Sequence, residues 1–243
     1  MKDLTKFKQG LDYIGLELSD AQMDQFLEFY ELLIEKNKVM NLTAITEFDD
    51  VVEKHFIDSL LLAKCMDLTK GLKVMDLGTG AGFPGIPLKI AFPNLEIVLA
   101  DSLNKRIKFL DEVIGKLGLD QQPGKISTVH GRAEDLGRKA DYREKFDLCV
   151  SRAVANLSTL SEYCLPFVKV CGYFVSYKSG TVDEELRQSK NAVHLLSSDV
   201  VKCEKLTLPG STAGRSFVFI RKNAPMLKKY PRKAGVPGKE PLS

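Results

Sequence analysis

The chain has 243 residues, of which 44% are hydrophobic and 28% charged, and its net charge is +3. This suits one globular domain with a small appendage, and five cysteines without a Cys-x-x-Cys pair argue against a disulfide framework or a metal site. No run of about 18 apolar residues could span a membrane, and the N-terminus lacks the apolar segment of a signal peptide, so we expect a cytoplasmic protein.

The first 70 residues carry helical signals. Ser19-Asp-Ala-Gln22 is a capping box, and a second helix is expected from Val51 to Met66. Behind the capping box, apolar side chains recur at helical spacing: Met23, Phe26, Leu27, Tyr30, Leu33 and Ile34. His55 and Asp58 are expected as a solvated surface pair rather than a polar cluster. Residues 1–70 are therefore predicted to form a helical cap.

From Lys73 short apolar runs alternate with amphipathic segments. The strand candidates are Lys73–Met75, Leu95–Ala100, Lys125–Val129, Phe146–Ser151, Gly172–Tyr177, Val200–Leu206 and Ser216–Ile220. The helix candidates are Ile86–Ala91, Lys105–Leu117, Leu157–Phe167 and Val182–Leu196. The alternation predicts a doubly wound α/β domain over residues 71–222. The last two strands, with no helix between them, are expected to pair antiparallel at the edge of the sheet, an arrangement typical of class I methyltransferases.

The segment from Val74 to Gly85 contains two nested glycine patterns. From Gly80 it satisfies G-x-G-x-x-G, the dinucleotide fingerprint. From Asp76 it reads acid-x-Gly78-x-Gly80-x-Gly82, which is typical of a loop that holds S-adenosylmethionine. The two patterns predict a nicotinamide-dependent oxidoreductase and a methyltransferase, respectively, and a tight turn without a ligand is the third possibility.

Acidic residues at neighbouring strand ends bear on this choice. Asp101 follows the loop by about twenty residues and suits ribose hydroxyls, which both cofactors carry. Asp76 discriminates better, because a carboxylate there would attract the ammonium of S-adenosylmethionine and repel a diphosphate. Gly131-Arg-Ala-Glu-Asp135 follows the third strand, where an adenine would lie. Glu134 and Asp135 also suit the first turn of a helix, which is the simpler explanation of that motif alone.

The fourth strand leads into Ser151-Arg-Ala-Val-Ala-Asn156, from which such enzymes reach the methyl acceptor. The chain has neither an Asn/Asp-Pro-Pro-aromatic turn here, as adenine-amine methylation uses, nor a Pro-Cys pair, as cytosine-carbon methylation uses. Arg152 belongs either to the cleft or to a surface ion pair. Lys178, at the end of the fifth strand, can approach the same cleft. We predict that both position the substrate and that no general base is needed.

The C-terminal tail, residues 223–243, is basic. Residues 215–243 carry 8 basic and 1 acidic side chains, whereas residues 1–70 carry 8 and 14. Proline and glycine in the tail oppose a regular helix, and basic residues beside an aromatic suit a phosphate backbone and a stacked base. We predict that the tail packs on or near the active-site face, the alternative being a disordered solubilising segment. The predicted RNA contacts are Tyr230, Arg232, Lys233 and Lys239.

Six motifs occur together in order along the chain. They are Asn41-Leu-Thr-Ala-Ile45, His55-Phe-Ile-Asp-Ser-Leu60, the Gly78–Pro87 loop, Arg132-Ala-Glu134, Ser151-Arg-Ala-Val-Ala155 and Tyr230-Pro-Arg-Lys-Ala-Gly-x-Pro-x-Lys-x-Pro-Leu242. This set closely resembles the ribosomal RNA small subunit methyltransferase G family, also called glucose-inhibited division protein B. Two departures are visible: Thr79 stands where the family often has serine, and Lys36 where it often has tryptophan.

The resemblance implies a class I, Rossmann-like methyltransferase with S-adenosylmethionine as cofactor. It implies N7-methylguanosine formation in a loop of bacterial 16S ribosomal RNA, with that RNA or the small ribosomal subunit as partner, and we expect a monomer. Cofactor contacts are implied for Gly78, Phe83, Ala133, Glu134 and Arg152, in addition to those that the loop pattern predicts for Asp76, Gly80, Gly82 and Asp101. The remaining alternatives are the nicotinamide-dependent oxidoreductase and a non-enzymatic RNA-binding factor with the same fold.

Overall fold

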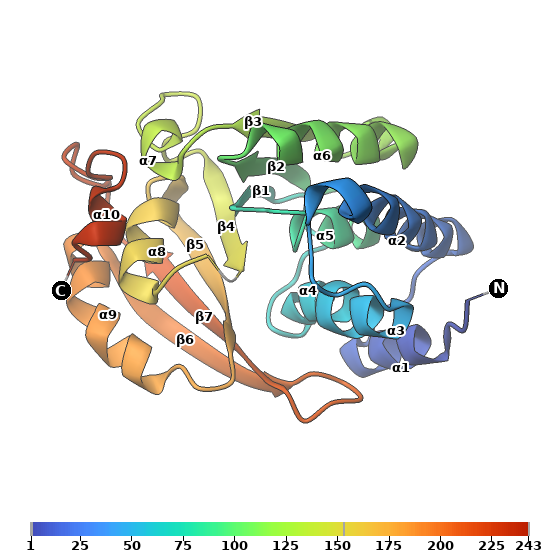
Figure 1. Ribbon diagram of the computed structural model, residues 1–243. Helices are drawn as coiled ribbons and strands as arrows, with labels where there is room; N and C mark the ends of the chain where they lie inside the picture. Colours follow the sequence, from blue (N-terminus) through green and yellow to red (C-terminus); the bar gives the residue numbers. More distant parts are fainter. Residues whose placement is uncertain (1, 153, 243) are drawn as a thin grey trace.

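The computed structural model describes residues 2–152 and 154–242 (Figure 1). Its centre is a seven-stranded sheet in the order β3-β2-β1-β4-β5-β7-β6. The strands are β1 (Lys73–Leu77), β2 (Glu96–Asp101), β3 (Ile126–His130), β4 (Phe146–Arg152), β5 (Val168–Ser179), β6 (Ser198–Thr207) and β7 (Gly214–Lys222). The first five are parallel, and β7 runs antiparallel to both β5 and β6. This confirms the predicted mostly parallel sheet with an antiparallel edge pair.

The N-terminal region is helical. Its α-helices are α1 (Thr5–Ile14), α2 (Asp20–Met40), α3 (Phe48–Val51) and α4 (Asp58–Leu60). The capping box is confirmed at the start of α2, where the Gln22 amide donates to Ser19 Oγ and the Ser19 amide to Gln22 Oε1. The single helix expected from Val51 is interrupted: a π-helical segment, Val52–Ile57, precedes α4, and a 3₁₀ turn, Leu61–Lys64, follows it. No helix in the described residues is long and apolar enough to cross a membrane.

Helices cover both faces of the sheet. The later ones are α5 (Gly85–Ala91), α6 (Asn104–Lys116), α7 (Ala133–Leu136), α8 (Leu157–Cys164), α9 (Asp183–Leu195) and α10 (Val236–Lys239), with a 3₁₀ turn at Leu119–Gln121. Successive strand residues point to opposite faces, so that Val74 packs with the cap, α5 and α6, while Met75 packs with α8 and α9. Both faces of the sheet are therefore buried, as expected for a doubly wound domain.

The cap shares its core with the glycine loop. Phe26 and Phe29 of α2 surround Phe56, with ring centroids 5.0 and 5.8 Å from it. Phe83, from the loop after β1, joins this cluster at 5.3 Å from Phe29. The cap and the sheet thus meet next to the loop. The tail lies at the side of the molecule away from the cap, beside α7 and α8 (Figure 1).

Candidate active site

The glycine loop lies at the carboxyl edge of the parallel strands. Gly78, Gly80 and Gly82 all have positive φ angles, of 71°, 61° and 100°. Only glycine adopts this left-handed backbone at little cost. A Cβ on Gly82 would also lie 2.6 Å from Cγ1 of Ile86, so both the backbone and the available space require glycine there. The loop can therefore bring its backbone close to a ligand in the adjoining cleft.

Asp76 lies beneath this loop and organises it. Its Oδ2 accepts hydrogen bonds from Thr79 Oγ1 at 2.7 Å and from the Gly85 amide at 2.8 Å. Burial raises the pKa of the carboxyl to about 6, although the hydrogen bonds from Thr79 and Gly85 favour the ionised form. Oδ1 is buried and has no hydrogen-bond partner among the described residues. The predicted ammonium contact stays a prediction, because the side chain is buried and holds the loop from behind.

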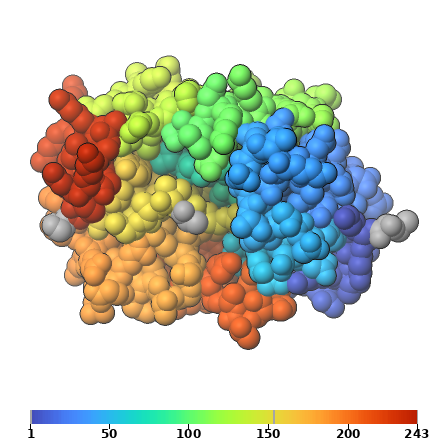
Figure 2. All heavy atoms as spheres, in the orientation of Figure 1, coloured from blue at the N-terminus to red at the C-terminus, as the bar shows by residue number. Residues whose placement is uncertain are grey.

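Two adjoining cavities open at this edge. The cap cavity, of about 460 Å³, is bounded by the cap, and the α7 cavity, of about 430 Å³, by α7 and the tail. Gly78, Asp101, Ser102 and Val154 line both, which makes the two cavities one elongated cleft. Figure 2 shows this face hollowed between the blue cap, the green α6 segment and the yellow α8 segment.

Asp101 stands where the two cavities meet. Its Oδ2 accepts hydrogen bonds from the Gly80 amide at 3.0 Å and from Arg106 Nη1 at 3.2 Å, and its Oδ1 accepts one from the Leu103 amide at 2.8 Å. These three donors fix the carboxylate at the end of β2. It is the position expected for a group that binds ribose hydroxyls.

The α7 cavity lies over the ends of β2 and β3. Ala133 and Glu134, the first two residues of α7, line it together with Tyr163 of α8 and Gly235 of the tail. The Gly235 amide donates to Glu134 Oε1 at 2.8 Å, which orients the carboxylate. The structure thus gathers Ala133 and Glu134 with Gly78 and Asp101 around one space, as predicted for the adenosine part of the cofactor.

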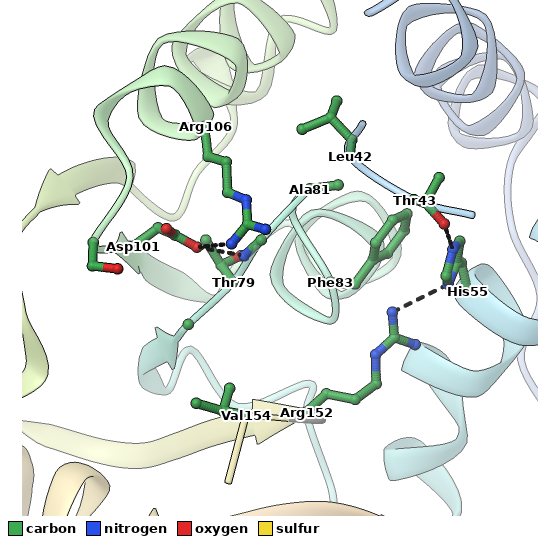
Figure 3. A pocket seen from close by; sticks show the side chains of 13 residues that line it. Leu42, Thr43, His55, Thr79, Ala81, Phe83, Asp101, Arg106, Arg152 and Val154 are labelled. Carbon is green, nitrogen blue, oxygen red and sulfur yellow. Dashed lines mark hydrogen bonds and ion pairs between the residues drawn. The ribbon is translucent and has the colours of Figure 1, made fainter. Parts of the chain in front are cut away.

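The cap cavity joins the cap to the glycine loop. His55 of the π-helical segment and Thr43 line it, together with Phe83 and Arg152. The His55 ring stacks on Phe83 with centroids 4.5 Å apart, and the Arg152 guanidinium lies 5.1 Å from the Phe83 ring centroid (Figure 3). Phe83 and Arg152, both expected cofactor residues, are therefore neighbours. Arg106 and Asp101 lie on the opposite side of the same cavity (Figure 3).

A buried polar network holds Arg152. Asp58 Oδ2 accepts from Arg152 Nη1 at 2.9 Å, and Asp58 Oδ1 accepts from Arg215 Nε at 2.6 Å. Arg152 Nη2 lies 3.3 Å from His55 Nδ1, and Thr43 Oγ1 lies 2.9 Å from His55 Nε2. Burial, and then the charge of Arg152, lower the pKa of His55 to about 4, so this imidazole is neutral at pH 7. The expectation of a solvated His55–Asp58 pair is wrong, because Arg152 of β4 contacts both residues and Arg215 of β7 also pairs with the buried Asp58.

Lys178 lines neither cavity. Its Nζ donates to the Ala155 carbonyl at 2.7 Å and to Glu185 Oε1 at 2.6 Å. The same Glu185 oxygen accepts from the Leu157 amide at the start of α8. Lys178 therefore anchors Ala155 and the start of α8, and its role in positioning the substrate stays a prediction.

The tail differs from the predicted RNA-binding arm. Tyr230 is only 5% exposed, so its ring is not available to stack on a base. Arg232 is paired with the buried Glu162, which its Nη2 approaches at 2.7 Å. Their anchoring role could not be read from the basic composition, because the partner of Arg232 lies 70 residues earlier in the chain. Lys233 and Lys239 are exposed and stay predicted RNA contacts.

Several residues that line the cleft escaped the sequence-based prediction. They are Leu42, Thr43, Ser102, Arg106, Val154, Tyr163 and Gly235. Two of these, Leu42 and Thr43, belong to the Asn41–Ile45 motif, which was therefore a usable signal. Ala153, in the motif after β4, lies outside the described residues. Within residues 2–152 and 154–242, no group of three His, Cys, Asp or Glu side chains could hold a metal ion.

Comparisons with known proteins identify the family. Residues 22–212 match the family model GidB, described as rRNA small subunit methyltransferase G. The chain is 50% identical to the ribosomal RNA small subunit methyltransferase G of Lachnoclostridium phytofermentans, over 100% of this chain and 98% of that protein. It is 48% identical to the protein of that name from Alkaliphilus oremlandii, over 100% and 99%.

A solved structure supports the fold. TYW2 of P. horikoshii, crystallised in complex with MeSAdo, superposes with a TM-score of 0.50 over 64% of this chain and 58% of that one, at 15% identity. At that identity the likeness concerns the fold alone, and it agrees with the class I, Rossmann-like arrangement of the sheet. With the family match over most of its length, the chain belongs to the rRNA small subunit methyltransferase G family.

Proposed function

We propose that this protein transfers a methyl group from S-adenosylmethionine to N7 of a guanine in 16S ribosomal RNA. The observation that carries the proposal is the elongated cleft at the carboxyl edge, in a chain that belongs to this family over nearly its whole length. The partner is 16S ribosomal RNA or the small ribosomal subunit, and we propose a monomer acting in the cytoplasm.

The residues of the cleft fit S-adenosylmethionine. Asp101 offers a carboxylate to ribose hydroxyls at the junction of the two cavities, and Glu134 offers one to the exocyclic amine of an adenine in the α7 cavity. The amino-acid end then falls beside the glycine loop and Arg152. When bound there, S-adenosylmethionine supplies an electrophilic methyl group next to a positively charged sulfur.

Guanine N7 carries a lone pair and no proton, so the chain does not have to supply a general base. His55 lines the cleft but is a weak base, because its pKa is about 4 and its two ring nitrogens contact Thr43 and Arg152. We therefore assign it no proton transfer. Catalysis then consists of holding the nucleophile and the methyl group in line, which in favourable cases contributes ~7–11 kcal/mol. Arg152, held by Asp58 and packed on Phe83, is the residue that we propose for this positioning.

The RNA substrate has to be unpaired at the target. N7 lies in the groove that A-form RNA makes deep and narrow, so an enzyme reaches it only when the base is splayed out. The exposed Lys233 and Lys239 of the tail are proposed to hold the phosphate backbone. Replacing both with alanine should lower the slope of log affinity against log salt by about 1.4, as expected for two lost single-strand phosphate contacts. An unchanged slope would exclude them from the interface.

The decisive experiment incubates the protein with labelled S-adenosylmethionine and ribosomal RNA from cells that lack this methyltransferase, and maps the modified base. Labelled N7-methylguanosine supports the proposal. RNA binding without label would favour the non-enzymatic factor, and binding of NADH without S-adenosylmethionine would favour the oxidoreductase. Arg152→Ala should lose turnover, whereas Arg187→Ala, in which an exposed arginine outside the cleft is removed, should keep it.

A further inference from the structure

The tail contributes a wall to the cofactor cleft. Gly235 lines the α7 cavity together with Ala133, and its amide donates to Glu134 Oε1 at 2.8 Å. The other carboxylate oxygen of Glu134 makes no hydrogen bond within the described part of the chain. The contact with Gly235 therefore restrains the rotation of a carboxylate that lines the α7 cavity.

Gly235 is held in place from the side that precedes it. The Arg232 amide donates to Glu162 Oε1 at 2.6 Å, and Arg232 Nε and Nη2 reach the two oxygens of Glu162 at 3.0 and 2.7 Å. Glu162 is fully buried on α8, directly before Tyr163, which lines the same cavity. The hydrogen bonds that the Arg232 guanidinium donates to Glu162 raise the pKa of Arg232, as expected when the ion pair stabilises the charged guanidinium.

Gly235 is also held from the side that follows it. Thr159 Oγ1, on α8, donates to the Pro237 carbonyl at 3.0 Å. Further back, Arg143 donates from its two terminal nitrogens to the carbonyls of Tyr230 and Met226, at 2.9 and 3.1 Å. The tail is therefore tied down on both sides of Gly235 without any RNA present.

From these contacts we propose that the tail is part of the cofactor site: Gly235 completes the α7 cavity, the Arg232–Glu162 pair holds it there, and the tail thereby sets the affinity for the cofactor before RNA binds. The proposal rests on the function proposed above. Coupling between two equilibria is reciprocal, so if the docked tail favours cofactor binding, cofactor binding should in turn favour the docked tail that carries Lys233 and Lys239. Arg232 is then a positioning residue for the cofactor rather than an RNA contact.

The test measures binding of S-adenosylhomocysteine to the full-length chain by titration calorimetry, without RNA. Arg232→Ala should raise Kd about tenfold, which corresponds to ~1.4 kcal/mol, and Arg232→Lys should recover part of the loss. The matched control is Lys228→Ala, which removes an equally charged, exposed tail residue that lines neither cavity. Circular dichroism verifies that each variant is folded. Equal Kd values for Arg232→Ala, Lys228→Ala and the wild type would overturn the proposal.

A second measurement uses the unaltered protein. Hydrogen exchange at the Gly235 amide should slow at least severalfold when S-adenosylhomocysteine is added, because the ligand closes the cavity over the Gly235–Glu134 hydrogen bond. If the chain bound S-adenosylhomocysteine and hydrogen exchange at the Gly235 amide did not change, the proposed role of the tail would be overturned and the proposed function would stand. A wild-type chain that does not bind the ligand would overturn the proposed function together with it.

Discussion

Replacing Asp58 with asparagine should destabilise the protein strongly. The substitution keeps the size of the side chain and removes the negative charge that two guanidinium groups share, Arg152 on β4 and Arg215 on β7. The side chains of Asp58, Arg152 and Arg215 are only 5%, 15% and 22% exposed, so solvent cannot replace the missing carboxylate. Breaking a buried pair by removing one partner costs about 3–5 kcal/mol. The arginines retain some exposure, and we therefore expect about 3 kcal/mol.

Urea unfolding at pH 7.5, followed by circular dichroism, measures this loss as a lower midpoint with an unchanged slope. The matched control is Asp50→Asn. Asp50 precedes Asp58 in the cap and pairs with Lys54, and the side chains of Asp50 and Lys54 are both more than 40% exposed. The control should unfold at the same urea concentration as the wild type. If Asp58→Asn lost less than about 1 kcal/mol, the two arginines would have to be solvated and the network would not be what holds Arg152.

Three further outcomes follow from the site. His55 has its pKa lowered to about 4, so its contribution to the free energy of unfolding should decrease by up to ~3 kcal/mol as pH falls from 6.5 towards 4. Urea unfolding should show the wild type losing that much stability relative to His55→Gln over this range. Asp76 has its pKa raised to about 6, so its own contribution to the free energy of unfolding should decrease as pH rises from 4 to 6, opposite in sign to the contribution of His55. The free energy of unfolding of Asp76→Asn should therefore rise relative to that of the wild type as pH rises from 4 to 6. A constant difference between the two proteins would contradict the raised pKa of Asp76. Gly82→Ala should cost ~1–3 kcal/mol more than Gly15→Ala, because both have positive φ but only Gly82 lacks room for a Cβ; equal melting temperatures would refute this.

The sheet was predictable because its signals are local. Each strand is a short apolar run bounded by polar segments, and the capping box of α2 lies within four consecutive residues. The interruption of the second cap helix was not predictable, because a π-helical segment such as Val52–Ile57 has no residue pattern of its own. It matters for the site, since it adjoins Asp58 and contains His55, both of which meet Arg152.

The positions of single site residues were predictable only where the loop pattern itself places them. Gly78 and Asp101 line the cleft as expected, since their positions follow from the ends of β1 and β2. Asp76 and Arg232 have the charges that a ligand would need, but their principal partners belong to the protein: the Gly85 amide and the Glu162 carboxylate. A sequence pattern reveals a charge, and it does not reveal which distant group neutralises that charge.

The shared core around Phe83 has a consequence for synthesis of the chain. The apolar side chains of α2, Phe26 and Phe29 among them, pack against Phe83 and α5, which follow them by more than forty residues. On the ribosome, this helix emerges before the surface that covers it exists. Its exposed aromatic face therefore needs β1, the glycine loop and α5 before it can be buried, so completion of the cap depends on the part of the chain that contains the glycine loop.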